Sequence, residues 1–387
     1  MSRKWCLLST PLLGFALVVG ACGGGPERGD APAPIGSAER CEANQAAGKL
    51  IFLSGFDFAA AAGILDIVAA EAEGYFDEMC LDVQLQSGLS PANSASLAAG
   101  TTQFAVIASF GEMVRQNVNG GTDLMAFAQL GHTSISELIV PAGTITSLSD
   151  LQGKTIGIKG DLPSPVQAML AAEGAQRGTF EELLLDGFDP VAHLALGIDA
   201  LPVYKSNEPA ALDREGIEYV EFDPLDFDIP ASFAVYISSR ENYEKWPTAI
   251  EDFVRAGLRG YRFAAENPEV AVAHAFELIN AAGNQFWLAE THELSRWRVE
   301  RSMVENVTPV GFVVGQLNTP RLGEEIQLLA DLGELETLPD WESMLEDSVV
   351  PKLHDDNGEL IWVPMNWSAL DWSHYRRAAR KSRGLAA

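Results

Sequence analysis

The sequence predicts an α/β protein with mostly parallel sheets and helices on both faces. Short apolar segments with strand periodicity alternate along the chain with segments of helical periodicity, and this βαβ order is typical of parallel sheets. Hydrophobic residues make up 47% of the 387 residues, so the chain can bury a large core. Because a single core stops growing near about 250–300 residues, we expect two lobes.

The predicted elements follow one another closely. Alternating or continuous apolar residues predict strands over 49–53, 81–85, 103–107, 124–128, 137–140 and 155–158, with a further strand ending at Tyr204. A helix is expected over 59–73. Ser90 followed by Pro91 marks another helix start, as does Ser164 before Pro165, because serine caps a helix and proline suits its first turn.

The N-terminal segment predicts secretion and lipidation. Arg3 and Lys4 precede an apolar run that is too short to span a membrane, and small residues follow it, which is the pattern of a signal peptide. Cys22 comes directly after Gly-Ala, so we expect cleavage before Cys22 and acylation of this residue. The alternative is an ordinary signal peptide with a chance cysteine. The Gly/Ala/Pro-rich residues 22–47 are then expected to form a flexible tether of an extracytoplasmic lipoprotein.

Charge and cysteine content limit the remaining possibilities. The net charge of −28 makes nucleic acid an improbable partner. No Cys-x-x-Cys or His-x-x-x-His spacing indicates a zinc site, and no cofactor is expected. Cys41 and Cys80 precede the first two predicted strands, whose starts lie at one end of a parallel sheet, so we expect a disulfide between them. The alternative is a free Cys41 and a buried, inert Cys80.

Several segments resemble a known family. Residues 74–83 (GYFDEMCLDV), 98–105, 147–157 and 197–200 are similar, in family order, to periplasmic binding proteins for nitrate, sulfonates, taurine and thiamine-pyrimidine precursors. Residues 204–209 (YKSNEP) resemble the branch that handles thiamine-pyrimidine precursors. The resemblance implies a type II periplasmic-binding-protein fold, in which two α/β lobes hold a small ligand in a cleft and deliver it to an ABC permease.

The resemblance also implies domain boundaries. The chain is expected to cross between lobes near Leu138 and near residues 234–237. The expected parts are a signal peptide (1–21), the tether (22–47), lobe one (48–136 plus 237–320), lobe two (137–236) and a C-terminal helical extension (321–387).

Candidate ligand-binding residues follow predicted strands, where open α/β sheets bind ligands. Phe56, Asp57 and Phe58 suit a flat heterocycle with polar edges, although Asp57 could instead cap the next helix. The other candidates are Ser109, Phe110, His132, Ser164, Tyr204, Asn207 and Glu208, of which all but Tyr204 and Asn207 have a purely structural alternative. A carboxylate at Glu208 would pair with an amino-pyrimidine edge and repel an oxyanion.

The expected function is capture of a small planar nitrogen heterocycle for an ABC importer, without catalysis. Another solute, such as a sulfonate, nitrate or flavin, is the alternative. A thiamine-pyrimidine synthase of the same family would need Lys and His near the early loops, and residues 50–131 contain neither. A scaffolding lipoprotein is the third possibility, in which the tail beyond Trp362 would dock a protein or a membrane.

Overall fold

The computed structural model describes residues 33–58, 62–143, 145–283 and 289–364. The strands are β1 (Lys49–Leu53), β2 (Asp82–Gln86), β3 (Phe104–Ile107), β4 (Leu124–Gly131), β5 (Ser136–Pro141), β6 (Thr155–Ile158), β7 (Glu181–Leu184), β8 (Leu201–Tyr204), β9 (Tyr219–Phe222) and β10 (Phe233–Ser239). The α-helices are α1 (Ala38–Ala46), α2 (Ala62–Ala72), α3 (Tyr75–Glu78), α4 (Ser90–Ala98), α5 (Phe110–Gly120), α6 (Ser164–Ala172), α7 (Pro190–Leu194), α8 (Glu208–Arg214), α9 (Arg240–Lys245), α10 (Pro247–Glu266), α11 (Pro268–Ala282), α12 (Glu290–Val307), α13 (Thr319–Asp331) and α14 (Val349–Lys352). Short 3₁₀ helices cover Leu148–Leu151, Pro224–Phe227 and Trp341–Met344.

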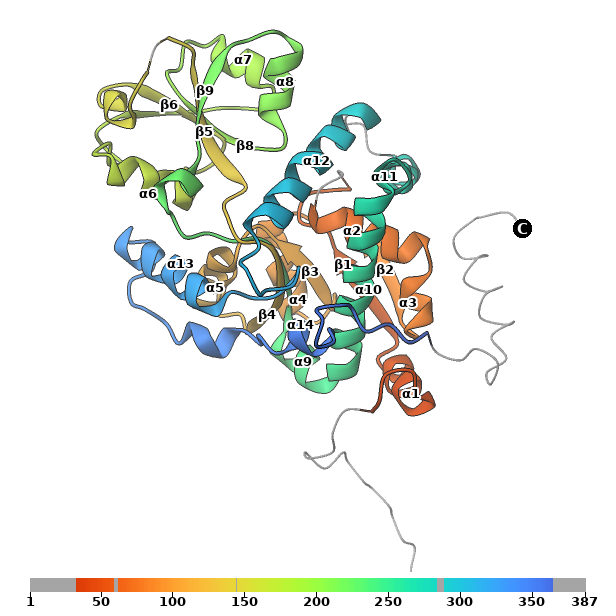
Figure 1. Cartoon of the computed structure of the whole chain (residues 1–387). Coiled ribbons are helices and arrows are strands. Elements are labelled where there is room, and N and C mark those ends of the chain that lie inside the picture. The colour runs from red at the N-terminus through yellow and green to blue at the C-terminus, as the bar shows by residue number, and fades with distance from the viewer. Residues whose placement is uncertain (1–32, 59–61, 144, 284–288, 365–387) are drawn as a thin grey trace, which may run out of the picture. The chain divides into compact units, whose positions relative to one another are not determined.

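Lobe one is built on a sheet with the strand order β2-β1-β3-β10-β4, of which Figure 1 labels β1, β2, β3 and β4. β1 pairs in parallel with β2 and β3, whereas β10 is antiparallel to both β3 and β4. Helices α2 and α10 pack on one side, where the rings of Phe104 and Phe253 stack with centroids 4.0 Å apart. Helices α5 and α13 supply the second apolar cluster of this lobe. The sheet is therefore buried between two helical layers and is parallel apart from β10.

Helices α2 and α10 approach each other closely because α10 carries a glycine at the contact. A Cβ atom on Gly260 would lie 1.9 Å from the carbonyl oxygen of Asp66, so no larger residue fits there. Asp66 is itself buried and accepts a hydrogen bond from the Tyr236 hydroxyl of β10. Burial raises the pKa of Asp66 to about 7.

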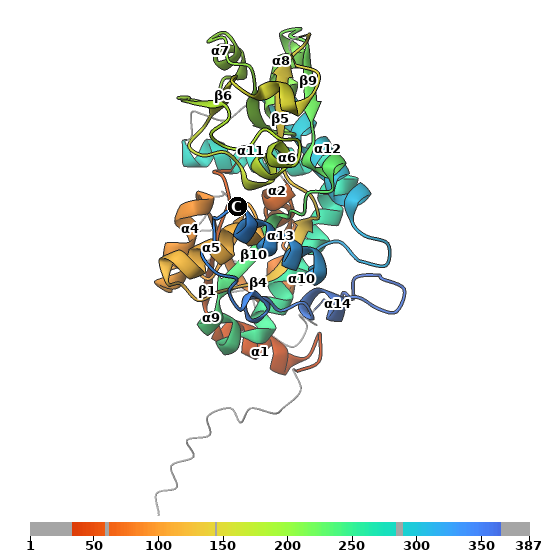
Figure 2. The same cartoon turned by 90° about the vertical axis from the view of Figure 1, so that its left-hand side faces the viewer.

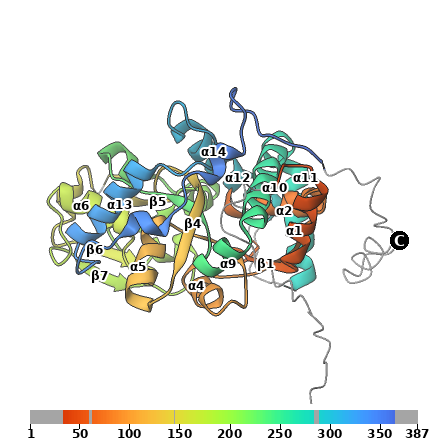
Figure 3. The ribbon, with the colours of Figure 1, turned by 90° about the horizontal axis from the view of Figure 1, so that it is seen from below.

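Lobe two has a different pairing from the mostly parallel sheet that the sequence predicts. β6 and β7 are parallel neighbours (Figure 3). Ala200, directly before β8, forms an isolated parallel bridge with Ile156 of β6. β5 is antiparallel to both β8 and β9. The physical reason is the path of the chain: β5 brings the chain from lobe one into lobe two, so it runs against its neighbours, as β10 does on the way back. Figure 1 and Figure 2 show β5, β6 and β9 of lobe two apart from the sheet of lobe one.

The crossing segments lie a few residues earlier than expected. The first covers residues 132–135, between the end of β4 and the start of β5, and Leu138 already pairs within lobe two. The second covers residues 228–232, just before β10, so residues 234–237 pair within lobe one. We therefore use lobe one for residues 33–131 and 233–364, and lobe two for residues 136–227.

The C-terminal part of the expected tether is a helix fixed to lobe one. Within α1, Cys41 forms a disulfide with Cys80, with the two Cα atoms 5.3 Å apart. Arg40 is 2% exposed and its guanidinium donates to the Asp252 carboxylate of α10 at 2.7 and 2.9 Å. Asn44 also donates to Asp252, at 2.7 Å. Residues 38–46 are thus a structural part of lobe one, because their polar side chains find buried partners far along the chain.

The described part of the expected C-terminal extension also belongs to lobe one. Ile326 and Leu329 of α13 pack in one core cluster, and Val349 and Val350 of α14 pack in the other. Trp362 lies edge-on against Tyr75 and donates to Glu78 at 3.0 Å. Residues 365–387, like Cys22, lie outside the described residues.

We expect the Cys41–Cys80 disulfide to stabilise lobe one. It closes a sequence separation of 39 residues, for which the chain-entropy model gives up to about 4 kcal/mol. The double variant Cys41→Ser/Cys80→Ser should unfold at lower urea concentration than the wild type, and reductant should shift the wild type to match it. Equal unfolding midpoints for the oxidised and reduced wild type would contradict this expectation.

Candidate functional site

The loop after β1 presents one exposed aromatic ring of lobe one. Phe56 is 50% exposed, whereas Phe58 is buried at 6%. Asp57 lies between them with a φ of 45° and accepts a hydrogen bond from the Ser87 hydroxyl at 2.9 Å. Ala59, which would begin the helix that Asp57 was expected to cap, lies outside the described residues. Of this aromatic pair, Phe56 is accessible to a ligand and Phe58 is part of the core.

The turn after β3 contains two further candidates with different outcomes. Ser109 is partly exposed and caps α5, since its hydroxyl accepts from the backbone N–H of Glu112 at 3.1 Å. Phe110 is 0% exposed and packs edge-on against Trp341. Phe110 is therefore a core residue rather than a ligand contact, because the first turn of α5 points it between the sheet and α13.

Glu112 is a further candidate site residue that the sequence analysis did not name. It lies partly exposed in the first turn of α5, where Ser90 donates to its Oε2 at 2.9 Å and Gln116 donates to its Oε1 at 3.0 Å. Burial raises the pKa of Glu112 above its usual value. The sequence feature that could have indicated Glu112 is its place three residues after Ser109, the serine that caps α5.

His132 lies at the first crossing and is 6% exposed. Its Nδ1 lies 2.8 Å from the amide nitrogen of Gln129, so Nδ1 accepts and the proton is on Nε2. Within the residues that the structure describes, Nε2 has no hydrogen-bond partner. Burial lowers the pKa of His132 to about 4, so the ring is neutral near pH 7. The edge contact with Phe312 completes a packed environment.

Glu208 is buried inside lobe two at 2% exposure. The Lys159 ammonium group contacts its Oε1, and the backbone N–H of Tyr204 donates to its Oε2 at 2.9 Å. Both carboxylate oxygens are therefore engaged by the protein. Tyr204 itself is 44% exposed. Burial of its hydroxyl, together with the nearby charges of Glu208 and Glu112, raises the pKa of Tyr204.

Polar side chains of lobe two meet carboxylates and a histidine of lobe one. Ser164, at the start of α6, donates to Glu334 at 2.9 Å, and Ser206 donates to Glu300 of α12 at 2.6 Å. Asn207 lies 3.1 Å from Nε2 of His292, whose Nδ1 faces Arg214. The sequence analysis named Ser164 and Asn207, but not these partners in lobe one.

Two exposed phenylalanines meet from opposite lobes. Phe56 of lobe one and Phe188 of lobe two have ring centroids 6.0 Å apart at 76°. Phe188 is 66% exposed, although it lies beside another ring. It comes from the loop after β7, where no periodic pattern singles it out. Phe56, Phe188 and Tyr204 thus give the interlobe region accessible aromatic surface from both lobes.

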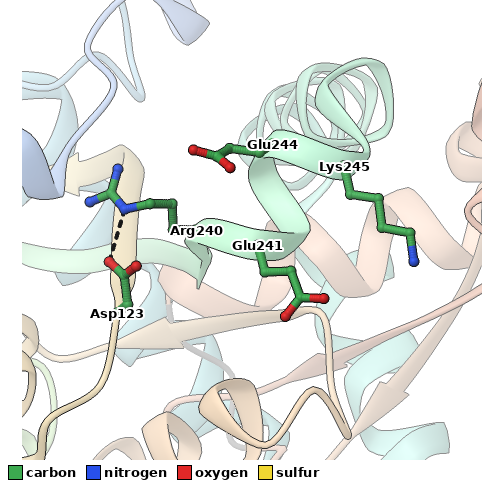
Figure 4. Close-up of a pocket in the computed structure, with 5 residues that line it drawn as sticks. All are labelled: Asp123, Arg240, Glu241, Glu244 and Lys245. Carbon is green, nitrogen blue, oxygen red and sulfur yellow. Dashed lines mark hydrogen bonds and ion pairs between the residues drawn. The ribbon is translucent and has the colours of Figure 1, made fainter. Parts of the chain in front are cut away.

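An open hollow lined by charged side chains lies at the end of the lobe-one sheet that is away from the crossing segments (Figure 4). Its residues are Asp123, Arg240, Glu241, Glu244 and Lys245. Asp123 and Arg240 form an ion pair of 2.9 Å at the start of β4, whereas β4 ends next to the crossing to lobe two. None of the sequence-predicted site residues lines this hollow, so we do not place the ligand there.

The described residues hold neither a metal-binding cluster nor a helix that could cross a membrane. They contain no cluster of His, Cys, Asp and Glu side chains that could hold a metal ion. Among the same residues, no helix combines the length and the apolar character that a membrane crossing requires.

Comparison with known proteins identifies relatives. The formylaminopyrimidine-binding protein of Halalkalibacterium halodurans is 28% identical over 215 residues, 53% of this chain and 64% of that protein. The riboflavin-binding protein RibY of Chloroflexus aurantiacus is 29% identical over 141 residues, 36% of this chain and 40% of that protein. The matched regions thus span less than two thirds of either relative.

A solved structure supports the fold. The periplasmic aliphatic sulphonate binding protein SsuA from Escherichia coli superimposes with a TM-score of 0.59 at 14% identity, covering 82% of this chain and 97% of that one. This confirms the expected two-lobe periplasmic-binding-protein architecture. Residues 62–271, more than half of the chain, match the model of the family described as NMT1/THI5 like. The chain belongs to the NMT1/THI5-like family.

Proposed function

We propose that this chain is the solute-binding protein of an ABC importer and that it captures a small planar nitrogen heterocycle between its lobes. The observation that carries the proposal is the meeting of Phe56 and Phe188, two exposed rings from opposite lobes. Aromatic faces stack on flat rings, and because these two rings meet, one flat ligand bound at this place would contact both. The names of two relatives, a formylaminopyrimidine-binding and a riboflavin-binding protein, also refer to heterocycles.

The polar groups near these rings support the same ligand class. Glu112 is partly exposed and offers carboxylate oxygens, which accept hydrogen bonds from amino groups and ring N–H groups. Tyr204 is 44% exposed, and its hydroxyl can either donate or accept. A thiamine-pyrimidine precursor has a flat ring and N–H donors that fit this combination. The main alternative is another small solute, such as a sulfonate, nitrate or flavin.

The proposed role is binding without chemistry. A synthase of this family would need a lysine and a histidine near the early loops, and residues 50–131 contain neither. Burial lowers the pKa of both His132 and His292 to about 4, so both rings are neutral near pH 7. This argues against their use as acids or bases.

The proposed location is outside the cytoplasm, on a lipid anchor at Cys22. The solved relative from Escherichia coli is described as periplasmic. The basic start, short apolar run and Gly-Ala-Cys sequence support processing before Cys22. The tether would then end at α1, which the Cys41–Cys80 disulfide fastens to lobe one. A membrane permease is the proposed partner.

A ligand screen with aromatic variants tests the function. A thermal-shift screen over pyrimidines, flavins, purine catabolites, sulfonates and nitrate should identify a heterocycle, since ligand at 100 times its Kd adds about 2.7 kcal/mol to stability. Phe56→Ala and Phe188→Ala should each weaken its binding by about 0.5–1.5 kcal/mol, or roughly two- to tenfold. Calorimetry measures this effect, and Leu196→Ala, at another exposed apolar residue of lobe two, is the matched control. Unchanged affinity in both phenylalanine variants would contradict the proposed site.

Glu208 provides a second test, because its structural and ligand-binding roles predict different results. If it serves Lys159 and the backbone of Tyr204, as its contacts indicate, Glu208→Gln should cost about 1–3 kcal/mol of stability. Ligand affinity should then stay the same, and adding Lys159→Met should restore part of the stability. A loss of affinity without a loss of stability would instead return Glu208 to direct ligand contact. Urea unfolding and calorimetry together distinguish the two results.

The anchor is tested by Cys22→Ser. Without the thiol there is no site for the diacylglycerol, so the variant should appear either as soluble, unacylated protein or as an uncleaved precursor. Membrane fractionation and intact mass measurement separate these forms from the acylated wild type. A variant that is still processed and membrane-bound would rule out lipidation at Cys22.

A further inference from the structure

The first turn of α5 has no N–H group left for a ligand. Helix N-termini bind anions because their first N–H groups lack partners within the helix. Here the N–H of Phe110 donates to the Ser232 hydroxyl at 2.9 Å. The N–H of Gly111 donates to Oε1 of Glu325 at 2.9 Å, and that of Glu112 donates to the Ser109 hydroxyl at 3.1 Å. The protein's own side chains therefore accept from all three groups.

Glu325 is the central acceptor of this arrangement. It is 4% exposed on α13, and its other oxygen, Oε2, accepts from the Ser232 hydroxyl at 2.8 Å. A Cβ atom on Gly111 would lie 2.9 Å from Oε1 of Glu325 and 2.8 Å from Leu329, so a glycine at this position lets α13 approach. The carboxyl group thus occupies the place at the end of α5 where a bound oxyanion would lie.

The surroundings make this position relevant to the ligand. Ala108 and Ser109, which connect β3 to α5, are partly exposed, and so is Glu112. A ligand that reaches Ser109 is therefore next to the first turn of α5. At the start of α6 in lobe two, the Ser164 hydroxyl donates to Glu334 and Pro165 has no N–H group to offer.

We propose that Glu325 is a specificity-determining residue that excludes oxyanions from the ligand site at the end of α5. Its carboxyl group fills the position and uses the N–H of Gly111 that nitrate or a sulfonate would need. The inference rests on the proposed function and narrows its ligand to neutral or cationic molecules that donate hydrogen bonds. Glu325 acts by occupying the end of α5 and does not itself contact the heterocycle.

The test uses small anions rather than the unidentified ligand. Thermal unfolding of the full mature chain is followed with millimolar nitrate, methanesulfonate or formate against chloride at equal ionic strength. The unfolding temperature of the wild type should be the same in all four anions. The Escherichia coli sulphonate-binding protein is the positive control for methanesulfonate. Glu325→Ala should unfold at a lower temperature, and formate, which fits the space of the missing carboxyl group, should restore part of the loss.

Two variants control for the change in packing and charge. Glu325→Gln keeps an oxygen acceptor of the same size and should show no specific formate response. Glu324→Ala removes a carboxylate from the same helix, where it pairs with Arg321 at the surface, and should behave like the wild type. A formate response shared by either control would assign the effect to general salt stabilisation and overturn the proposal.

Two further outcomes would also overturn it. One is binding of nitrate or methanesulfonate by the wild type, and this measurement is valid even if Glu325→Ala does not fold. The other is a folded Glu325→Ala variant that shows no specific response to formate. These results are separate from the ligand screen: a screen without any heterocycle would reject the proposed function, while the anion titrations would still decide the role of Glu325.

Discussion

The position of β10 is the constraint on which the rest of the structure depends. This strand enters the lobe-one sheet between β3 and β4 and pairs antiparallel with both, so it closes the excursion of the chain through lobe two. Its fit depends on a glycine opposite Phe233, because a Cβ atom on Gly131 would lie 1.8 Å from that ring. Tyr236 on the same strand donates to the buried Asp66, which fastens α2 to the sheet. β10 therefore determines where the chain returns to lobe one. It also requires a glycine at the end of β4 and holds α2 against the sheet.

The C-terminal helices that follow β10 supply many of the polar side chains in the interlobe region. α12 carries His292 and Glu300 to the start of α8, and α13 carries Glu325 to the start of α5. The loops after β1 and β3 contribute Phe56 and Ser109 from the first half of the chain. The candidate site is thus assembled from both halves of lobe one around the ends of its strands, and lobe two adds its own aromatic and polar groups. Because these parts are far apart in the sequence, many residues with contacts in the interlobe region belong to no recognisable sequence motif.

Local patterns predicted the elements well and their long-range partners poorly. Strand periodicity placed β1, β2 and β3 within a residue or so of their observed bounds, because alternation and capping are local properties. The antiparallel pairing of β5 and β10 depends on the path between lobes, which no short pattern encodes. Likewise α1 has a weakly apolar sequence, and Arg40 finds Asp252 only 212 residues later. Glu325 and Gly111 are separated by 214 residues, so no local pattern indicates their contact. Phe188 lies in a loop, where no periodicity indicates its role.

The attachment of α1 determines where mechanical load enters the protein. Any pull on the N-terminal segment reaches the folded body through residues 38–46, where the Cys41–Cys80 disulfide and the Arg40–Asp252 ion pair connect it to α10 and to the turn before β2. Both connections lie in lobe one, and neither involves the crossing segments 132–135 and 228–232. Tension on the segment is therefore carried by one lobe alone. A force on α1 would therefore act on lobe one and not directly on the crossing segments.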